Sequence, residues 1–154
     1  MKTLFALSFV LFSMTVLAAG GPYNENADAK LDIKKALSQA SVSNTPVIIV
    51  FGANWCGDCK MLDHAMKSGT SAALISRDFT VVKVDVGYMD KNVDLAKSYG
   101  VPLDKGIPAI AIVSPKNDLL YSTRAGELAD AEQMGEAGIY KFLKQVTASY
   151  VAKK

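Results

Sequence analysis

The sequence contains few of the residues that build metal centres or covalent cross-links. Its 154 residues include two cysteines, Cys56 and Cys59, and one histidine, His64. A zinc site needs four ligands, so these three side chains would suffice only if two chains shared a site. A disulfide between cysteines three positions apart closes a very small loop and adds little stability, which argues against a purely structural bridge. Redox chemistry is the interpretation that we favour for the pair.

The sequence also has no concentration of charge of one sign. It contains 17 lysines and arginines and 15 aspartates and glutamates, for a formal net charge of +2. The basic residues are scattered, and only Lys153 and Lys154 form a pair at an end. We therefore expect no nucleic-acid-binding surface.

A long uncharged run occurs only near the N-terminus, from Leu4 to Ala19, after the basic residue Lys2. It is short for a membrane span and ends in small residues, a pattern typical of a cleaved signal peptide. An uncleaved membrane anchor is the alternative. We expect a signal peptide in residues 1–19, a leader in residues 20–28 and one domain in residues 29–154. The mature protein is then expected to be periplasmic or secreted.

Hydrophobic periodicity predicts an alternation of helices and strands after the leader. The run Val47–Phe51 has no polar alternation and predicts a central strand buried on both faces. Asp90 is expected to cap one helix. The pattern predicts an α/β fold, with a mixed sheet of about four strands and helices on both faces. Helices are expected at 29–40, 56–67, 71–77, 91–99 and from 137 or 138 to 151, and strands at 47–51, 80–86, 109–113 and 119–123.

The spacing of the two cysteines suits disulfide exchange. Cys56 is expected in the first turn of a helix, where free backbone N–H groups and the helix dipole favour the thiolate that attacks disulfides. Cys59 lies three residues later on the same face and turns inward. We predict that Cys56 attacks a partner disulfide and that Cys59 resolves the mixed disulfide.

The segment from Trp55 to Lys60, Trp-Cys-Gly-Asp-Cys-Lys, resembles the thioredoxin signature, with Asp58 where thioredoxin has proline. The resemblance covers about Ala29 to Val146 and implies a thioredoxin-like fold of the kind found in exported bacterial oxidoreductases. It implies no metal and no cofactor besides a redox-active Cys56–Cys59 disulfide.

Several further residues match the family in position. Ile107 and Pro108 match its loop with a cis proline, and the resemblance implies that the Ile107 backbone pairs with substrate. Gly126 matches a glycine that lines the same groove. Gly57 would let a partner chain approach closely, and Trp55 would offer a flat apolar surface beside the thiol. For Trp55 the alternative is packing in the core.

The chain departs from the family beside the thiols. Val50 stands where thioredoxin has a buried aspartate that assists proton transfer, so Lys83, at the position of the family's lysine, is expected to lack its usual partner. We predict a role for Lys83 in proton transfer. Asp58 is a candidate substrate-binding residue or base, although its charge would oppose thiolate formation and a carboxylate is favoured in a first helical turn anyway. His64 is the other candidate base, with an exposed surface histidine as the alternative.

These observations predict a protein-disulfide reductase or isomerase. The Gly-Asp dipeptide between the cysteines adds no positive charge, which favours a potential nearer the thioredoxin value of about −270 mV than the about −120 mV of a strong oxidant. Expected partners are disulfide-bearing exported proteins and an upstream thiol reductant, such as a membrane electron-transfer protein, and the protein is expected to be a monomer. The alternative is a binding, chaperone or metalloprotein-assembly module with little turnover. Ala53 and Leu62 argue against a thiol peroxidase and a cysteine phosphatase, respectively.

Overall fold

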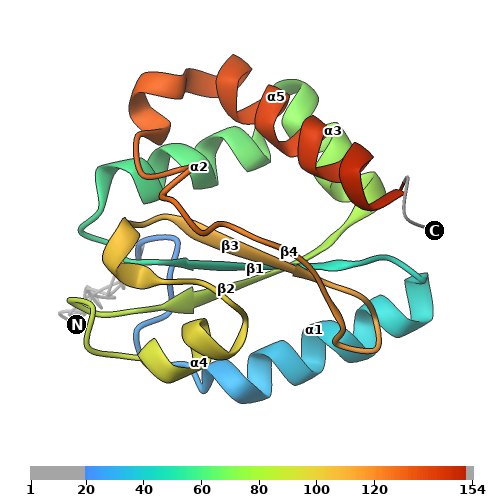
Figure 1. The fold of residues 1–154 in the computed structure, drawn as a ribbon, viewed down its shortest axis with the longest axis horizontal. Coiled ribbons are helices and arrows are strands. Elements are labelled where there is room, and N and C mark those ends of the chain that lie inside the picture. Colours follow the sequence, from blue (N-terminus) through green and yellow to red (C-terminus); the bar gives the residue numbers. More distant parts are fainter. Residues whose placement is uncertain (1–19, 152–154) are drawn as a thin grey trace, which may run out of the picture.

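The computed structural model describes residues 20–151 and shows an α/β fold with one sheet (Figure 1). The residues assigned to a signal peptide lie outside the described part. In chain order the elements are α1 (Ala29–Ser43), β1 (Val47–Gly52), α2 (Gly57–Lys67), α3 (Gly69–Asp78), β2 (Thr80–Asp85), α4 (Val93–Ser98), the 3-10 turn η1 (Leu103–Lys105), β3 (Ala109–Val113), β4 (Leu119–Ser122) and α5 (Ala131–Val151).

The sheet has four strands in the order β2-β1-β3-β4. Strand β1 pairs parallel with β2 and antiparallel with β3, and β4 returns antiparallel beside β3. Helices α2, α3 and α5 cover one face, and α1 and α4 cover the other (Figure 1). The predicted mixed four-stranded sheet with helices on both faces is therefore confirmed.

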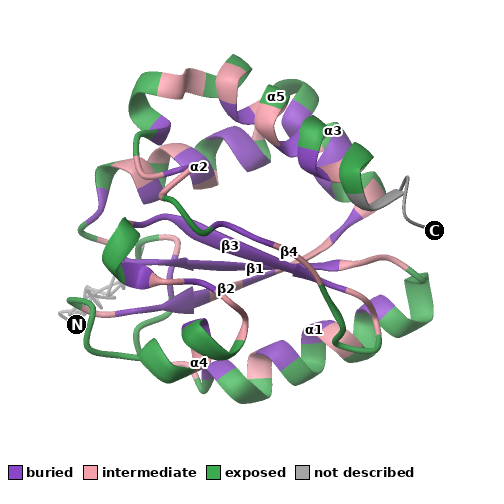
Figure 2. Ribbon diagram, in the orientation of Figure 1, coloured by how far each residue is buried: buried purple, intermediate pink, exposed green. Residues whose placement is uncertain are grey.

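Strand β1 forms the centre of the core. All six of its residues are buried, as the apolar run predicted, and Figure 2 shows the buried strands between exposed outer helix faces. Burial on both faces follows from its position between two strands and two layers of helices. The strand ends at Gly52, and the short turn after it leads directly into Cys56 and α2. The site is therefore attached to the most constrained strand of the fold.

Helix α1 begins as the sequence predicted. The Asp28 side chain accepts a hydrogen bond from the Leu31 backbone N–H at 3.1 Å, which caps the helix. Its buried residues follow helical spacing and face the sheet: Ala29, Ile33, Ala36 and Ala40. No helix among residues 20–151 is long and apolar enough to cross a membrane.

Three predicted helix starts are wrong. Helix α3 begins at Gly69, two residues before the predicted start at Ser71. Helix α4 begins at Val93 after Asn92, which adopts a left-handed conformation, while Asp90 accepts a hydrogen bond from the Tyr88 N–H instead of capping the helix. Helix α5 begins at Ala131, well before residue 137. Gly135 interrupts it with φ 60° and ψ 179°, a conformation that glycine alone adopts readily, so the periodic pattern marked only the part after the interruption.

The segment assigned to a leader is packed onto the domain. Tyr23 is 3% exposed and belongs to the hydrophobic core. The Asn54 side chain forms two hydrogen bonds with the Tyr23 backbone: it accepts from the N–H at 2.9 Å and donates to the carbonyl at 2.8 Å. Residues before α1 are therefore held beside the turn that carries the cysteines.

Candidate active site

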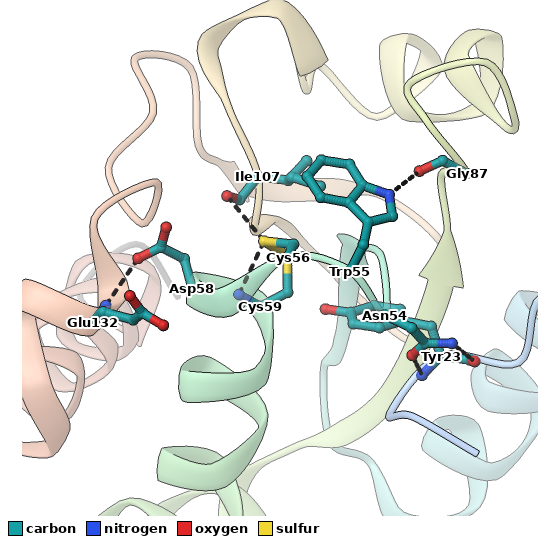
Figure 3. The surroundings of a disulfide bond; sticks show 9 residues. All are labelled: Tyr23, Asn54, Trp55, Cys56, Asp58, Cys59, Gly87, Ile107 and Glu132. Carbon is teal, nitrogen blue, oxygen red and sulfur yellow. Dashed lines mark hydrogen bonds between the residues drawn. A yellow bond between two sulfur atoms is a disulfide. The ribbon is translucent and has the colours of Figure 1, made fainter.

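The two cysteines form a disulfide at the start of α2, with their Cα atoms 5.2 Å apart (Figure 3). Cys56 is the N-cap residue of the helix, and its sulfur accepts a hydrogen bond from the Cys59 backbone N–H at 3.1 Å. In the reduced protein, this N–H and the helix dipole would stabilise a thiolate at Cys56. The helix start thus provides the electrostatics that the spacing predicted.

The two sulfurs differ in how far they are covered. Cys56 is 6% exposed and lies at the edge of the site, whereas Cys59 is 0% exposed and faces the core. A partner disulfide can therefore approach only Cys56, which leaves Cys59 to act within the protein.

The loop that contains Ile107 and Pro108 lies beside Cys56. The Ile107 carbonyl oxygen lies 3.6 Å from Cys56 Sγ, close enough to accept a hydrogen bond from the thiol of the reduced protein. The Ile107–Pro108 peptide bond is cis, the isomer that the resemblance implies. Gly126 lies against the backbone of Lys105, two residues before Ile107: its φ is 77°, and a Cβ there would collide with the Lys105 carbonyl oxygen.

Trp55 forms an exposed aromatic surface beside Cys56. Its side chain is 49% exposed, its Nε1 donates to the Gly87 carbonyl at 2.8 Å, and its ring stacks on Tyr88 with centroids 5.7 Å apart. The alternative of core packing is therefore wrong for Trp55. The stacked pair presents a flat apolar face at the rim of the site.

On the other side of the disulfide, α2 is tied to the start of α5. Asp58 Oδ1 accepts a hydrogen bond from the Glu132 backbone N–H at 2.9 Å (Figure 3). A Cβ on Gly57 would collide with the Glu132 carboxylate, so this side chain lies directly over the glycine. Asp58 thus binds a neighbouring helix, and Glu132 adds a second carboxylate next to the Cys-Gly-Asp-Cys turn.

Lys83 has a partner, contrary to the expectation from Val50. The two residues are paired in register on β2 and β1, but the Lys83 ammonium turns to Asp63 on α2 and forms a salt bridge there. The side chains are 18% and 15% exposed, and burial lowers the pKa of Lys83. Asp63 also binds Lys67 at 2.9 Å. The acid that pairs with the lysine is therefore supplied by the helix instead of by the central strand.

His64 does not approach the thiols. Its side chain is exposed and lies 3.2 Å from a Glu136 carboxylate oxygen on α5. The alternative of a surface histidine is the one that the structure supports. Within residues 20–151, no group of three or more His, Cys, Asp or Glu side chains is arranged to bind a metal ion.

Three residues beside the site were not identified from the sequence: Tyr23, Asp63 and Glu132. Asp63 follows Cys59 by four residues, so helical spacing alone would have placed it on the same face of α2. Tyr23 and Glu132 had no comparable signal, because each comes from a segment without periodicity that approaches the site only through tertiary packing.

Comparison with known proteins places these features in a wider group. A family model described as thioredoxin-like matches residues 28–115. The crystal structure of a disulphide isomerase from Xylella fastidiosa is 44% identical in sequence, with a TM-score of 0.80, and the match covers 84% of this chain and 99% of that one. A thioredoxin from Mycoplasmoides gallisepticum is 34% identical over 77 residues, which cover 50% of this chain and 68% of that protein.

Some relatives are much longer than the matched region. Protein disulfide-isomerase A6 from Mesocricetus auratus is 32% identical over 127 residues, which make up 81% of this chain but 27% of that protein. The match to a bifunctional thioredoxin reductase/thioredoxin from Mycobacterium leprae is 34% identical and covers 50% of this chain and 16% of that protein.

We predict that Asp63→Ala lowers the free energy of unfolding by about 1 to 3 kcal/mol, because it leaves the largely buried Lys83 ammonium without its partner. Asp32→Ala is the matched control, since Asp32 also lies in a helix but pairs with the exposed Lys35. Asp32→Ala should lower the free energy of unfolding by about 1 kcal/mol or less. Urea denaturation of the oxidised proteins measures both, and equal losses would contradict the assignment.

Proposed function

The chain belongs to the thioredoxin-like family, and from this premise we propose that it is a thiol–disulfide oxidoreductase that reduces or isomerises disulfides in exported proteins. The observation that carries the proposal is the asymmetry of the pair at the start of α2. Cys56 Sγ accepts the Cys59 N–H at the edge of the protein, whereas Cys59 is fully buried behind it. One thiol is therefore suited to attack and the other to resolve.

The reaction begins with the reduced protein. The Cys56 thiolate attacks one sulfur of a substrate disulfide, a new S–S bond forms, and the other substrate sulfur leaves with the electron pair and takes up a proton. Cys59 then loses its proton and attacks Cys56 Sγ. The second substrate sulfur leaves as a thiolate, so the substrate gains two electrons and the protein ends as the Cys56–Cys59 disulfide.

The surroundings of Cys56 suit an extended substrate segment. The Ile107 backbone lies beside Cys56 Sγ, where it can pair with the substrate backbone as an added strand. We assign substrate contact to Ile107 and Pro108 on this basis, and to the exposed ring of Trp55. For Gly57 and Gly126 substrate contact rests on the sequence alone, because Gly57 lies under the Glu132 carboxylate and Gly126 lies against the Lys105 carbonyl. Asp58 and Glu132 place negative charge beside this path, which favours substrates with basic residues next to the cysteine.

A reducing or isomerising direction is favoured over oxidation. The dipeptide between the cysteines carries a carboxylate and no cation, so the thiolate at Cys56 has no positive side chain within the motif to stabilise it. The name of the Xylella fastidiosa neighbour, a disulphide isomerase, supports isomerisation beside reduction. The protein then needs an upstream thiol reductant, and a membrane electron-transfer protein would fit the periplasmic or secreted location that the N-terminal pattern predicts.

Insulin reduction tests the proposed activity. The reduced protein should accelerate precipitation of the insulin B chain by dithiothreitol, and Cys56→Ser should abolish the acceleration because the attacking thiol is lost. Ser41→Ala is the control and should retain full activity, because Ser41 is exposed on α1, which covers the face of the sheet opposite α2. If the unaltered protein binds disulfide-bearing substrates without any turnover, the chain is a binding module and not a reductase.

The reduction potential tests the direction. Equilibration in glutathione buffers should give a value near that of thioredoxin, about −270 mV, because no cation stabilises the thiolate from within the motif. The ratio of dithiol to disulfide can be read by alkylation and mass spectrometry. A potential above about −150 mV would identify an oxidant and contradict the reductase proposal.

A further inference from the structure

The hydroxyl group of Tyr23 is buried without a partner beside the resolving cysteine. Tyr23 is 3% exposed, and among residues 20–151 no group forms a hydrogen bond with its hydroxyl. Buried polar groups in native proteins are nearly always paired, and an exception near reactive atoms suggests a role in another state of the protein. The structure shows the disulfide form, in which Cys59 carries neither a proton nor a charge.

The hydroxyl and the sulfur of Cys59 lie on the same side of Gly52, at the end of β1. A Cβ placed on Gly52 would collide with the Tyr23 hydroxyl and lie 3.0 Å from Cys59 Sγ. Figure 3 shows the hydroxyl end of the Tyr23 ring directed toward Cys59. The absence of a side chain at Gly52 therefore lets the two groups approach each other beneath the disulfide.

The position of Tyr23 is fixed from its backbone. The Asn54 side chain accepts a hydrogen bond from the Tyr23 N–H at 2.9 Å and donates one to the Tyr23 carbonyl at 2.8 Å. Asn54 is also two residues before Cys56, so the same turn holds both the tyrosine and the attacking cysteine. A tyrosine so restrained has little freedom to find another partner.

We propose that Tyr23 is the residue that stabilises Cys59 during the resolving step, by donating a hydrogen bond from its hydroxyl to the Cys59 thiolate. The inference rests on the proposed dithiol cycle and identifies a group that acts where thioredoxin's buried acid is replaced by Val50. The proton of the Cys59 thiol passes to solvent, Tyr23 keeps its own proton, and the thiolate then attacks Cys56 Sγ and expels the substrate thiolate.

The charged groups near Tyr23 support a donor role. Burial, reinforced by the negative charge of Asp85, raises the pKa of Tyr23, so its hydroxyl keeps the proton at neutral pH. Lys83 Nζ lies 6.0 Å from the centre of the Tyr23 ring, but its charge is paired with Asp63. Asp85 lies 3.7 Å from the Lys91 ammonium. Glu25, in the segment before α1, accepts a hydrogen bond from the Asn54 side chain, and Asp58 and Glu132 lie on the other side of the disulfide, on α2 and α5.

The direct test measures the pKa of Cys59 in a Cys56→Ser background, where Cys59 is the only thiol. Cysteine labelled with ¹³C at Cβ reports the titration by NMR. Tyr23→Phe should raise the Cys59 pKa by about one to two units, because a hydrogen bond to the charged form is lost. Tyr99→Phe is the matched control, since its hydroxyl binds Asn117 at 3.1 Å, and it should cause no change. An equal Cys59 pKa in the Tyr23→Phe and parent proteins would overturn the proposal.

A second measurement uses the active dithiol and Ellman's reagent. Attack by Cys56 releases one thionitrobenzoate, and attack by Cys59 on the mixed disulfide releases the second. Tyr23→Phe should slow the second release roughly 3- to 10-fold near neutral pH, since the smaller thiolate fraction outweighs the greater nucleophilicity. It should leave the first release unchanged. Slowing of both releases alike would contradict a role at Cys59.

Thermal unfolding separates this role from a structural one. No described residue forms a hydrogen bond with the hydroxyl in the disulfide form, so oxidised Tyr23→Phe should have a Tm equal to or above that of the unaltered protein. A clearly lower Tm would show that the hydroxyl stabilises the oxidised fold and would overturn the proposal. Neither the titration nor the unfolding experiment requires protein substrate turnover, so a failure of the insulin assay would count against the proposed function alone.

Discussion

The hydrogen bond from the Cys59 backbone N–H to Cys56 Sγ is the interaction on which the rest of the site depends. It places a sulfur where a helix usually has a capping oxygen, at the positive end of α2. The bond exists because β1 ends at Gly52 and the short turn after it delivers Cys56 to the helix start. Because β1 is completely buried, it holds the turn and Cys56 in a fixed position.

The same geometry creates a problem of proton handling. Cys59 must become a thiolate within the core, where burial disfavours charge, and Val50 gives it no neighbouring acid. The fold pairs the nearby Lys83 with Asp63, so that lysine does not remain as an unpaired buried cation. The Tyr23 hydroxyl then offers a neutral donor on the inner side of Cys59. The site thus resembles that of thioredoxin in its Cys-Gly-Asp-Cys motif but differs from it in the residues on the inner side of Cys59.

The sequence was sufficient to predict the sheet, most helices, and the positions of Cys56 at a helix start and of Cys59 in the core. Periodicity and motif spacing, on which these predictions depend, are local properties. It also predicted the cis peptide before Pro108 through the family resemblance. It was insufficient where tertiary contacts decide. The salt bridge between Asp63 on α2 and Lys83 on β2 depends on how the folded chain brings these two elements together. The burial of Tyr23 depends on hydrogen bonds from Asn54 to a segment that has no periodic pattern. The start of α5 was missed because Gly135 interrupts the helical pattern.

The central claim is that Cys56 attacks and Cys59 resolves. It is tested most directly by mixing reduced Cys59→Ser protein with a disulfide-bonded peptide and measuring the intact mass without reductant, beside Cys56→Ser under the same conditions. We predict that the Cys59→Ser protein accumulates a mixed disulfide through Cys56, because no second thiol can release the peptide. The Cys56→Ser protein should form none, since Cys59 is buried. Mixed disulfide formation by Cys56→Ser, or none by Cys59→Ser, would contradict the account.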